Sequence, residues 1–198
     1  GKLAPIEVIP YGFPPVYQSK VYYNQSRFLR LKLLFVGNLS QQKGIADLFA
    51  AVEGLKNYVE LTVVGRKVNR NCPALDAALQ KHRWIPSLPH EDVLKLMREH
   101  DVLVFPSLFD GFGLVITEAM SQGTPVIATD RSAGPDLINH GQNGWIINAG
   151  STECLKAAIE ELLHHPKSVL EAGREAVVTA SRRPWKAYSD DLVNAVSY

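Results

Sequence analysis

The fold is most clearly indicated by residues 101–128, which read DVLVFPSLFDGFGLVITEAMSQGTPVIA. An apolar run of strand length is followed by a loop that holds the acid Asp110. A helix is expected to begin near Leu114 and to carry Glu118 in its second turn. A second apolar run, Pro125–Ala128, follows that helix. A strand, a helix and a second strand in this order form the repeating unit of a parallel sheet.

The same alternation extends through most of the chain, because stretches with helical spacing separate most of the apolar runs. Strands are predicted at Leu33–Val36, Leu61–Val64, Trp84–Pro86, Val102–Phe105, Pro125–Ala128 and Trp145–Ile147. Helices are predicted over Ala46–Leu55, the stripe of Val93, Leu96, Met97 and His100, the segment from Leu114, the stripe Leu155–Leu163 after the N-cap Ser151, Val169–Ala180, and Trp185–Val196. We expect an α/β fold, a Rossmann-like open parallel sheet of about six strands flanked by helices.

The chain divides into three predicted segments. Residues 1–30 are rich in proline and tyrosine and follow neither a strand nor a helix period, so they are interpreted as a hinge strand and a surface loop. Residues 31–165 form the predicted Rossmann-like domain, and residues 166–198 form helices that pack on it. Pro166 and Pro184 are expected in the first turns of these last helices, where proline is tolerated.

Composition excludes several classes of protein. The 198 residues are 46% hydrophobic and 21% charged with a net charge of +1, which provides no basic field for a nucleic acid. The longest apolar run, Leu48–Val52, is far shorter than the ~20 residues of a membrane span, so the chain is expected to be cytosolic or a soluble part of a larger protein. Cys72 and Cys154 lack the spacing of a zinc site or a disulfide framework, and six scattered histidines predict no metal cluster.

Two apparent nucleotide-binding motifs fail on spacing. Gly111 and Gly113 would need a third glycine to match the dinucleotide fingerprint, but Ile116 stands at that position. The loop Gly37–Gly44 places its lysine before the second glycine, so it is not a Walker A sequence. Neither a nicotinamide-dependent oxidoreductase nor a P-loop enzyme is therefore indicated.

The loop before the helix at Leu114 nevertheless favours an anion site. Backbone N–H groups at a helix N-terminus suit a phosphate, and Gly111 and Gly113 have no side chains to block its approach. Asp110 and Glu118 accept hydrogen bonds when ionised, which suits sugar hydroxyls. An ordinary strand-to-helix turn, with Asp110 as an N-terminal charge and Glu118 on a solvated face, is the alternative. Lys43, in a loop at the same sheet edge, favours the phosphate interpretation.

These segments together resemble the C-terminal, nucleotide-sugar-binding half of a family-4 retaining glycosyltransferase of the GT-B fold. The resemblance extends over roughly residues 6–163. The matching segments are a hinge motif at Val8–Gly12, a phosphate loop at Val36–Gly44, a paired-acid signature at Asp101–Ala128, and weaker motifs at Gly134–Asp136 and Asn143–Gly144.

The resemblance implies a role for each matching residue. Lys43 would balance the charge of the leaving diphosphate, Glu118 would accept hydrogen bonds from the ribose, and Asp110 would meet the donor sugar. These three form the expected catalytic set, and Trp84–Ser87 would lie along the nucleotide base. The expected nucleotide-binding residues are Gly37, Asn38, Lys43, Gly111, Phe112, Gly113, Leu114 and Glu118. No metal and no cofactor are expected, and the donor substrate would be a UDP-, GDP- or ADP-sugar.

Two positions depart from the family pattern. Asn38 stands where the family usually has an arginine, which removes a charge-assisted contact to the diphosphate. Arg66 or another cation is a candidate to replace it. Asp110 stands where the family has its first glutamate, so the carboxylate keeps its chemistry but has a shorter reach.

The resemblance also implies what this chain lacks. The acceptor would bind an N-terminal domain outside these residues, so the chain alone is expected to bind the donor but not to transfer sugar. The whole protein is expected to act in polysaccharide biosynthesis in the cytoplasm, without nucleic acid, and a peripheral contact with the inner membrane face stays open. The basic clusters at 66–70 and 182–183 are interpreted mainly as solvated surface. A non-catalytic sugar-nucleotide-binding or docking subunit and a GT-B-like sugar-nucleotide epimerase are the alternatives.

Overall fold

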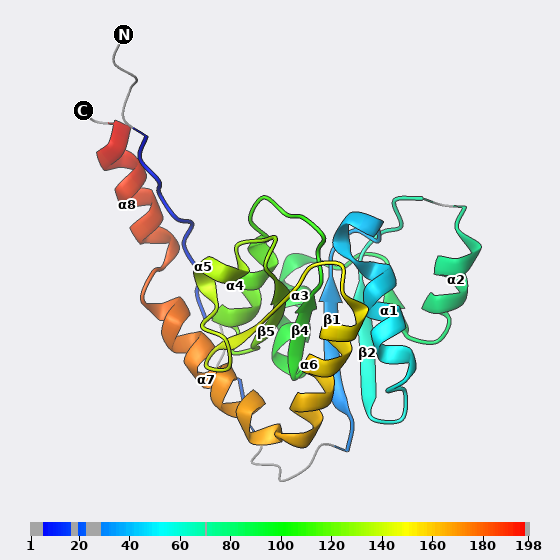
Figure 1. The fold of residues 1–198 in the computed structure, drawn as a ribbon. Helices are drawn as coiled ribbons and strands as arrows, with labels where there is room; N and C mark the ends of the chain where they lie inside the picture. Colours follow the sequence, from blue (N-terminus) through cyan, green and yellow to red (C-terminus); the bar gives the residue numbers. More distant parts are fainter. Residues whose placement is uncertain (1–5, 17–19, 23–28, 70, 197–198) are drawn as a thin grey trace.

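The computed structural model describes residues 6–16, 20–22, 29–69 and 71–196. The described strands form one six-stranded sheet in the order β3-β2-β1-β4-β5-β6, in which every neighbouring pair is parallel (Figure 1). The strands are β1 (Leu31–Val36), β2 (Val59–Val64), β3 (Arg83–Ile85), β4 (Val102–Phe105), β5 (Val126–Thr129) and β6 (Gly144–Ile147). The Rossmann-like parallel sheet predicted from the apolar runs is confirmed.

Both β1 and β2 begin two residues before their predicted starts. Leu31 pairs with Val59 at the beginning of the two strands, and both side chains are buried. Lys32 and Glu60 interrupt the apolar run at the next position, where they face solvent. Because the uninterrupted apolar runs begin only after Lys32 and Glu60, they do not reveal that Leu31 and Val59 belong to the strands.

The described helices are α1 (Ile45–Glu53), α2 (Pro73–Leu79), α3 (His90–Glu99), α4 (Leu114–Ser121), α5 (Gly134–Leu137), α6 (Thr152–His164), α7 (Pro166–Ser181) and α8 (Trp185–Val196), with a 3₁₀ helix, η1 (Gln41–Lys43). The predicted N-cap is confirmed, since Ser151 Oγ accepts a hydrogen bond of 3.1 Å from the Cys154 N–H. Pro166 opens α7 as predicted, whereas Pro184 lies just before α8. Neither α2 nor α5 was predicted from the sequence, because both are too short to show a helical period.

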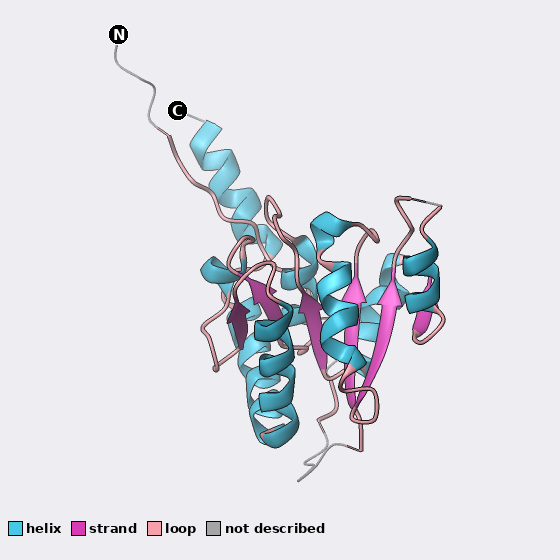
Figure 2. Cartoon of the chain, turned by 45° about the vertical axis from the view of Figure 1, so that its right-hand side comes forward, coloured by secondary structure: helices cyan, strands magenta, loops and turns pink. Residues whose placement is uncertain are grey.

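Helices cover both faces of the sheet (Figure 2). One buried cluster joins the sheet to α1 and α6, and a second joins it to α3, α4 and α7. Successive side chains of β1 alternate between them: Leu33 and Phe35 lie in the first cluster, and Leu34 lies in the second. Burial on both faces explains why the strands read as nearly continuous apolar runs.

The described part of the N-terminal segment contains a single-residue bridge instead of the expected hinge strand. Phe13 is buried, its N–H donates to the Arg183 carbonyl at 2.8 Å, and its carbonyl accepts from the Trp185 N–H at 3.2 Å. The flanking Pro10, Pro14 and Pro15 have no N–H to extend a ladder. Residues 6–16 lie beside α8 (Figure 1), and the rest of the predicted hinge lies partly outside the described residues.

Lys20 anchors this segment at the edge of the sheet where the strands begin. Its ammonium donates to the His100 carbonyl at 2.5 Å and to Thr124 Oγ1 at 2.9 Å. Burial lowers the pKa of Lys20 to about 8, although Asp101 partly opposes the shift. His100 is buried, as its place in the apolar stripe predicts, and burial lowers its pKa.

The strand order reverses direction between β1 and β4. In an open parallel sheet, loops on either side of such a reversal diverge and leave a crevice at the carboxyl ends of the strands. The same edge carries the loops after Val36 and Phe105, which hold Lys43 and Asp110. Among the described helices, none combines the length and the apolar character needed to cross a membrane.

Candidate functional site

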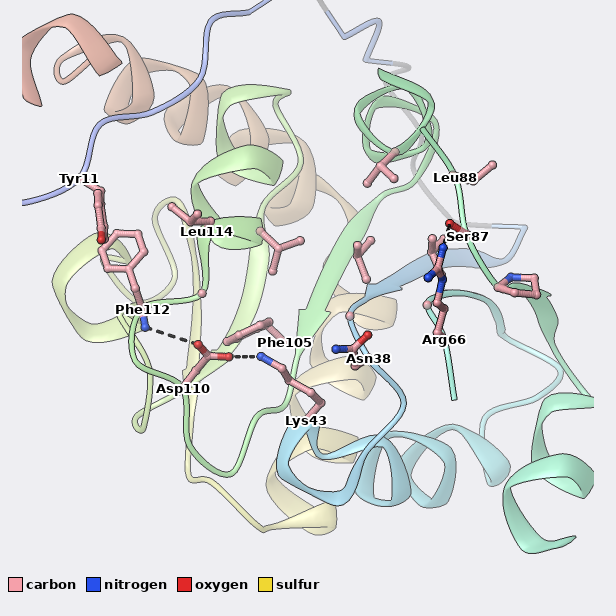
Figure 3. A pocket seen from close by; sticks show the side chains of 18 residues that line it. Tyr11, Asn38, Lys43, Arg66, Ser87, Leu88, Phe105, Asp110, Phe112 and Leu114 are labelled. Carbon is pink, nitrogen blue, oxygen red and sulfur yellow. Dashed lines mark hydrogen bonds and ion pairs between the residues drawn. The ribbon is translucent and has the colours of Figure 1, made fainter. Parts of the chain in front are cut away.

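A pocket of about 740 Å³ opens at the carboxyl ends of β1, β2, β3 and β4 (Figure 3). This volume lies in the range of small-molecule sites. Its lining comprises Tyr11, Val36, Gly37, Asn38, Lys43, Val64, Gly65, Arg66, Pro86, Ser87, Leu88, Val93, Phe105, Asp110, Phe112, Gly113, Leu114 and Val115. Of the predicted site residues, Gly37, Asn38, Lys43, Asp110, Phe112, Gly113 and Leu114 meet here, whereas Gly111 and Glu118 do not line the pocket.

A close approach of two loops places Lys43 opposite Asp110. Gly44 has a φ of +67°, and a Cβ at this position would lie 1.9 Å from the Pro106 carbonyl oxygen. Only glycine permits both this left-handed conformation and this distance. The N–H of Leu108 also donates to the Gln42 carbonyl at 2.8 Å. The loop after β1 is thereby held against the loop after β4.

Lys43 and Asp110, which both line the pocket, form an ion pair (Figure 3). The Lys43 ammonium also lies 5.5 Å from the centroid of the Phe105 ring. Asp110 Oδ1 accepts from the Phe112 N–H at 3.4 Å. The carboxylate expected to meet a sugar is therefore engaged with the lysine expected to meet the diphosphate.

The N-terminus of α4 is open toward the pocket. Gly113 is its N-cap, with a φ of +88°, and no side chain caps the helix. A Cβ at Gly113 would lie 2.8 Å from the Phe105 ring, so this turn also requires glycine. Leu114, the first residue of the helix, lines the pocket. The positive end of the helix dipole and its first N–H groups therefore favour an anion at this point.

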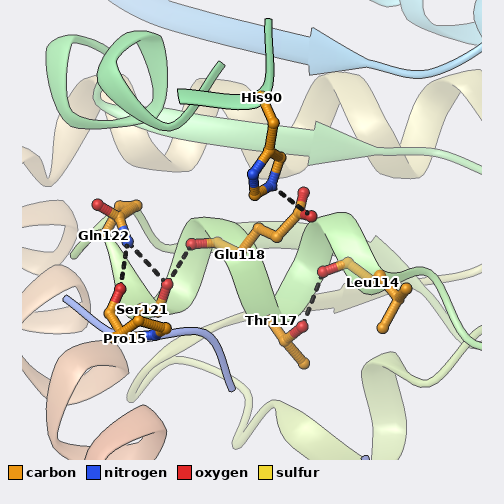
Figure 4. Close-up of polar contacts among 7 residues, drawn as sticks. All are labelled: Pro15, His90, Leu114, Thr117, Glu118, Ser121 and Gln122. Atoms are coloured by element: carbon orange, nitrogen blue, oxygen red, sulfur yellow. Dashed lines mark hydrogen bonds and ion pairs between the residues drawn. The ribbon is translucent and has the colours of Figure 1, made fainter. Parts of the chain in front are cut away.

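Glu118 lies one helical turn beyond Leu114 and therefore on the same face of α4. Its Oε1 lies 3.0 Å from His90 Nε2 at the beginning of α3 (Figure 4). The Glu118 side chain is 23% exposed, so it is not fully solvated, and it is not among the residues that line the pocket. Its carboxylate already has one partner, His90.

The pocket wall formed after β2 and β3 was only partly predicted from the sequence. Arg66 lines the pocket, although the sequence pointed to it only as a substitute cation. Leu88 and Val93 add an apolar surface that no motif marked. Within the predicted base-contact stretch, Pro86 and Ser87 line the pocket, whereas the Trp84 indole N–H donates to the Gly65 carbonyl at 3.0 Å. A glycine followed by a polar residue comes after both β1 and β2. This repeated pattern could have predicted that Arg66 lies at the pocket as Asn38 does.

The described residues contain no group of three or more His, Cys, Asp and Glu side chains that could hold a metal ion. The two cysteines are free and partly buried. A reaction that does not depend on a metal stays a prediction, and the cations available at the pocket come from the side chains of Lys43 and Arg66.

Known proteins resemble this chain in sequence and in fold. A family model described as glycosyl transferases group 1 matches residues 28–177. A glycogen synthase of Mycobacterium tuberculosis is 29% identical over 153 residues, which is 73% of this chain and 37% of the relative. A D-inositol 3-phosphate glycosyltransferase of Segniliparus rotundus is 30% identical over 171 residues, which is 80% of this chain and 38% of the relative. The chain thus spans little more than a third of these curated relatives.

The fold recurs in many solved structures, among them the following two. The C-terminal domain of a glycosyl transferase group 1 family protein from Francisella tularensis has a TM-score of 0.71 and 20% identity, covering 86% of this chain and 94% of that one. Anabaena Alr3699/HepE in complex with UDP and glucose has a TM-score of 0.77 and 22% identity, covering 85% of this chain and 48% of that one. Because the family model matches most of the sequence, the chain belongs to the glycosyl transferases group 1 family.

Proposed function

We propose that this chain is the donor-binding domain of a retaining, metal-independent family-4 glycosyltransferase, which moves a glycosyl group from a nucleoside-diphosphate sugar to an acceptor. The observation that carries the proposal is the open N-terminus of α4 facing Lys43 across one pocket. A helix dipole and an ammonium group are the features that a diphosphate needs. The similarity in fold to a protein solved with UDP and glucose supports a nucleotide-sugar donor.

In the proposed reaction, the bond between the sugar C1 and the diphosphate oxygen breaks, and the acceptor oxygen forms a new bond to C1 on the same face. The electron pair of the broken bond stays on the departing diphosphate, where negative charge develops, and the proton of the acceptor hydroxyl passes to an oxygen of that diphosphate. Lys43 and the first N–H groups of α4 stabilise that charge, which is the electrostatic part of catalysis. Asp110 holds Lys43 through the ion pair and approaches the sugar, and Glu118 accepts hydrogen bonds from the ribose.

The N-terminal acceptor-binding domain, the domain boundaries at residues 30 and 165, and the cytoplasmic or peripheral membrane location stay predictions. The alternative of a non-catalytic docking subunit draws its support from Asn38, which is exposed and uncharged in the pocket wall. Nucleotide binding would argue against a subunit that only docks, because such a subunit has no need for a charged ligand, whereas a non-catalytic subunit that binds sugar nucleotides would bind one as well.

A thermal-shift and calorimetric screen of this chain against UDP, GDP, ADP and their sugars tests the proposal. At least one of these ligands is expected to bind. A ligand at about one hundred times its Kd stabilises a folded protein by about 2.7 kcal/mol, which raises the Tm by roughly 5 to 10 °C at this chain length. A folded sample whose Tm and heat of mixing respond to none of them would overturn the proposal.

Glu118→Ala is expected to weaken the binding of the nucleoside diphosphate roughly tenfold and to leave inorganic diphosphate unchanged. The physical reason is that the carboxylate would contact only the ribose, and a hydrogen bond to a charged group contributes about 1.5 to 3 kcal/mol. Calorimetry with both ligands measures the difference. Glu171→Ala is the matched control, because Glu171 is an exposed acid on α7. Equal losses for both ligands would contradict the ribose assignment.

A further inference from the structure

The positive and negative side chains that line the pocket are unevenly distributed. The charged residues among those that line it are Lys43, Arg66 and Asp110. Lys43 is paired with Asp110, so this wall of the pocket is close to neutral. Arg66 has no carboxylate partner among the described residues, and its Nη2 makes only a long hydrogen bond of 3.4 Å to Ser87 Oγ. The net positive charge of the pocket therefore lies on Arg66.

The strand register places Arg66 directly beside Asn38. Val36 and Val64 are paired at the ends of β1 and β2, and a glycine follows each of them. Asn38 and Arg66 therefore occupy equivalent positions two residues beyond the ends of β1 and β2, and neighbouring strands lie about 4.8 Å apart in a sheet. The Leu39 N–H donates to the Arg66 carbonyl at 2.8 Å, so the two loops stay in register beyond the strands.

Gly37 and Gly65, which directly precede these two residues, let the two loops lie in close contact. A Cβ on Gly65 would lie 1.8 Å from the Gly37 carbonyl oxygen. Figure 3 shows Asn38 between the side chains of Lys43 and Arg66, all three of which line the pocket. An anion beside Asn38 would therefore have the ammonium on one side and the guanidinium on the other.

We propose that Arg66 is a nucleotide-binding residue that contacts the diphosphate and supplies the positive charge that Asp110 offsets at Lys43. This inference rests on the proposed function, in which the pocket takes a nucleoside diphosphate. A guanidinium presents a planar fork of donors that matches phosphate oxygens, and its contact with them is charge-assisted. Arg66 is exposed and weakly held by Ser87, so it is free to turn toward the ligand.

Calorimetry of Arg66→Ala with UDP and with uridine tests the inference, with GDP and ADP and their nucleosides measured in parallel. The affinity for the diphosphate that binds the wild type is expected to fall by about tenfold to a hundredfold, because a charge-assisted contact is lost. The affinity for the nucleoside is expected to stay unchanged. The difference between wild type and variant should shrink as salt is raised, since salt screens exposed charges.

Three further variants sharpen the result. Arg66→Lys is expected to lose less affinity than Arg66→Ala, because it keeps the charge but not the fork. The double variant Asn38→Arg/Arg66→Ala is expected to recover most of the lost affinity, because it moves the cation to the equivalent position in the loop after the neighbouring strand. Arg83→Ala is the matched control, since Arg83 is exposed at the start of β3, outside the pocket lining.

Equal losses for diphosphate and nucleoside would overturn the inference, because Arg66 would then contact the base or the ribose. Unchanged diphosphate binding in Arg66→Ala would overturn it as well. If that result came together with a loss in Lys43→Ala, the proposed function would survive and only the role of Arg66 would fail. A wild-type chain that bound no nucleoside diphosphate would overturn both.

Discussion

Lys43→Ala is expected to weaken the binding of the nucleoside diphosphate by about a hundredfold. The substitution removes a charge-assisted contact worth about 1.5 to 3 kcal/mol. It also leaves the Asp110 carboxylate without its partner, at 15% exposure, directly beside the incoming anion. Both changes weaken diphosphate binding, so the loss of affinity should exceed the loss caused by removing a cation that has no carboxylate partner. Calorimetry with UDP, GDP and ADP measures it.

Substitutions at Asp110 separate these two contributions. Lys43→Ala/Asp110→Asn is expected to bind the diphosphate more tightly than Lys43→Ala, because the uncompensated carboxylate is gone. Asp110→Asn alone is expected to bind it at least as tightly as the wild type, because the ammonium is released from its ion pair. Lys81→Ala is the matched control, since Lys81 pairs with Glu53 outside the pocket. An unchanged affinity in Lys43→Ala would remove the lysine from the proposed site.

Gly44→Ala is expected to lower the free energy of unfolding by about 3 kcal/mol and to weaken nucleotide binding more than tenfold. Placing an L-residue at a φ of +67° costs about 1 to 2 kcal/mol. The new Cβ would also lie 1.9 Å from the Pro106 carbonyl oxygen, and this backbone contact can be relieved only if the loops move apart. Such a movement takes the Lys43 ammonium away from the N-terminus of α4, so the two no longer act together on the diphosphate. Urea unfolding and calorimetry on the same samples measure both effects.

Gly141→Ala isolates the conformational part of this cost. Gly141 has a φ of +78°, but no atom lies within 4 Å of the position that a Cβ would take, so the substitution adds strain without a collision. It is expected to destabilise the chain by about 1 kcal/mol and to leave nucleotide binding unchanged. If Gly44→Ala behaved like Gly141→Ala in both measurements, the contact between the two loops would not be what positions Lys43.

The order of elements could be predicted because it depends on local patterns. Buried strands of a parallel sheet are apolar on both faces. The helices between them show apolar residues at helical spacing, with polar residues at the exposed positions. The predicted beginning of α4 at Leu114 and the N-cap at Ser151 are both confirmed, because capping depends on residues within one turn. Helices as short as α5 cannot be recognised in this way, since four residues contain no period.

The sequence alone determined that this chain is a parallel α/β domain with a lysine loop and a glycine loop at one edge of its sheet. Only the tertiary structure decided that Lys43 pairs with Asp110, that Glu118 meets His90 outside the pocket, and that Arg66 stands beside Asn38. Lys43 and Asp110 are 67 residues apart in the chain. Local periods carry no information about such distant contacts, which depend on strand order and on how closely the glycine loops approach each other.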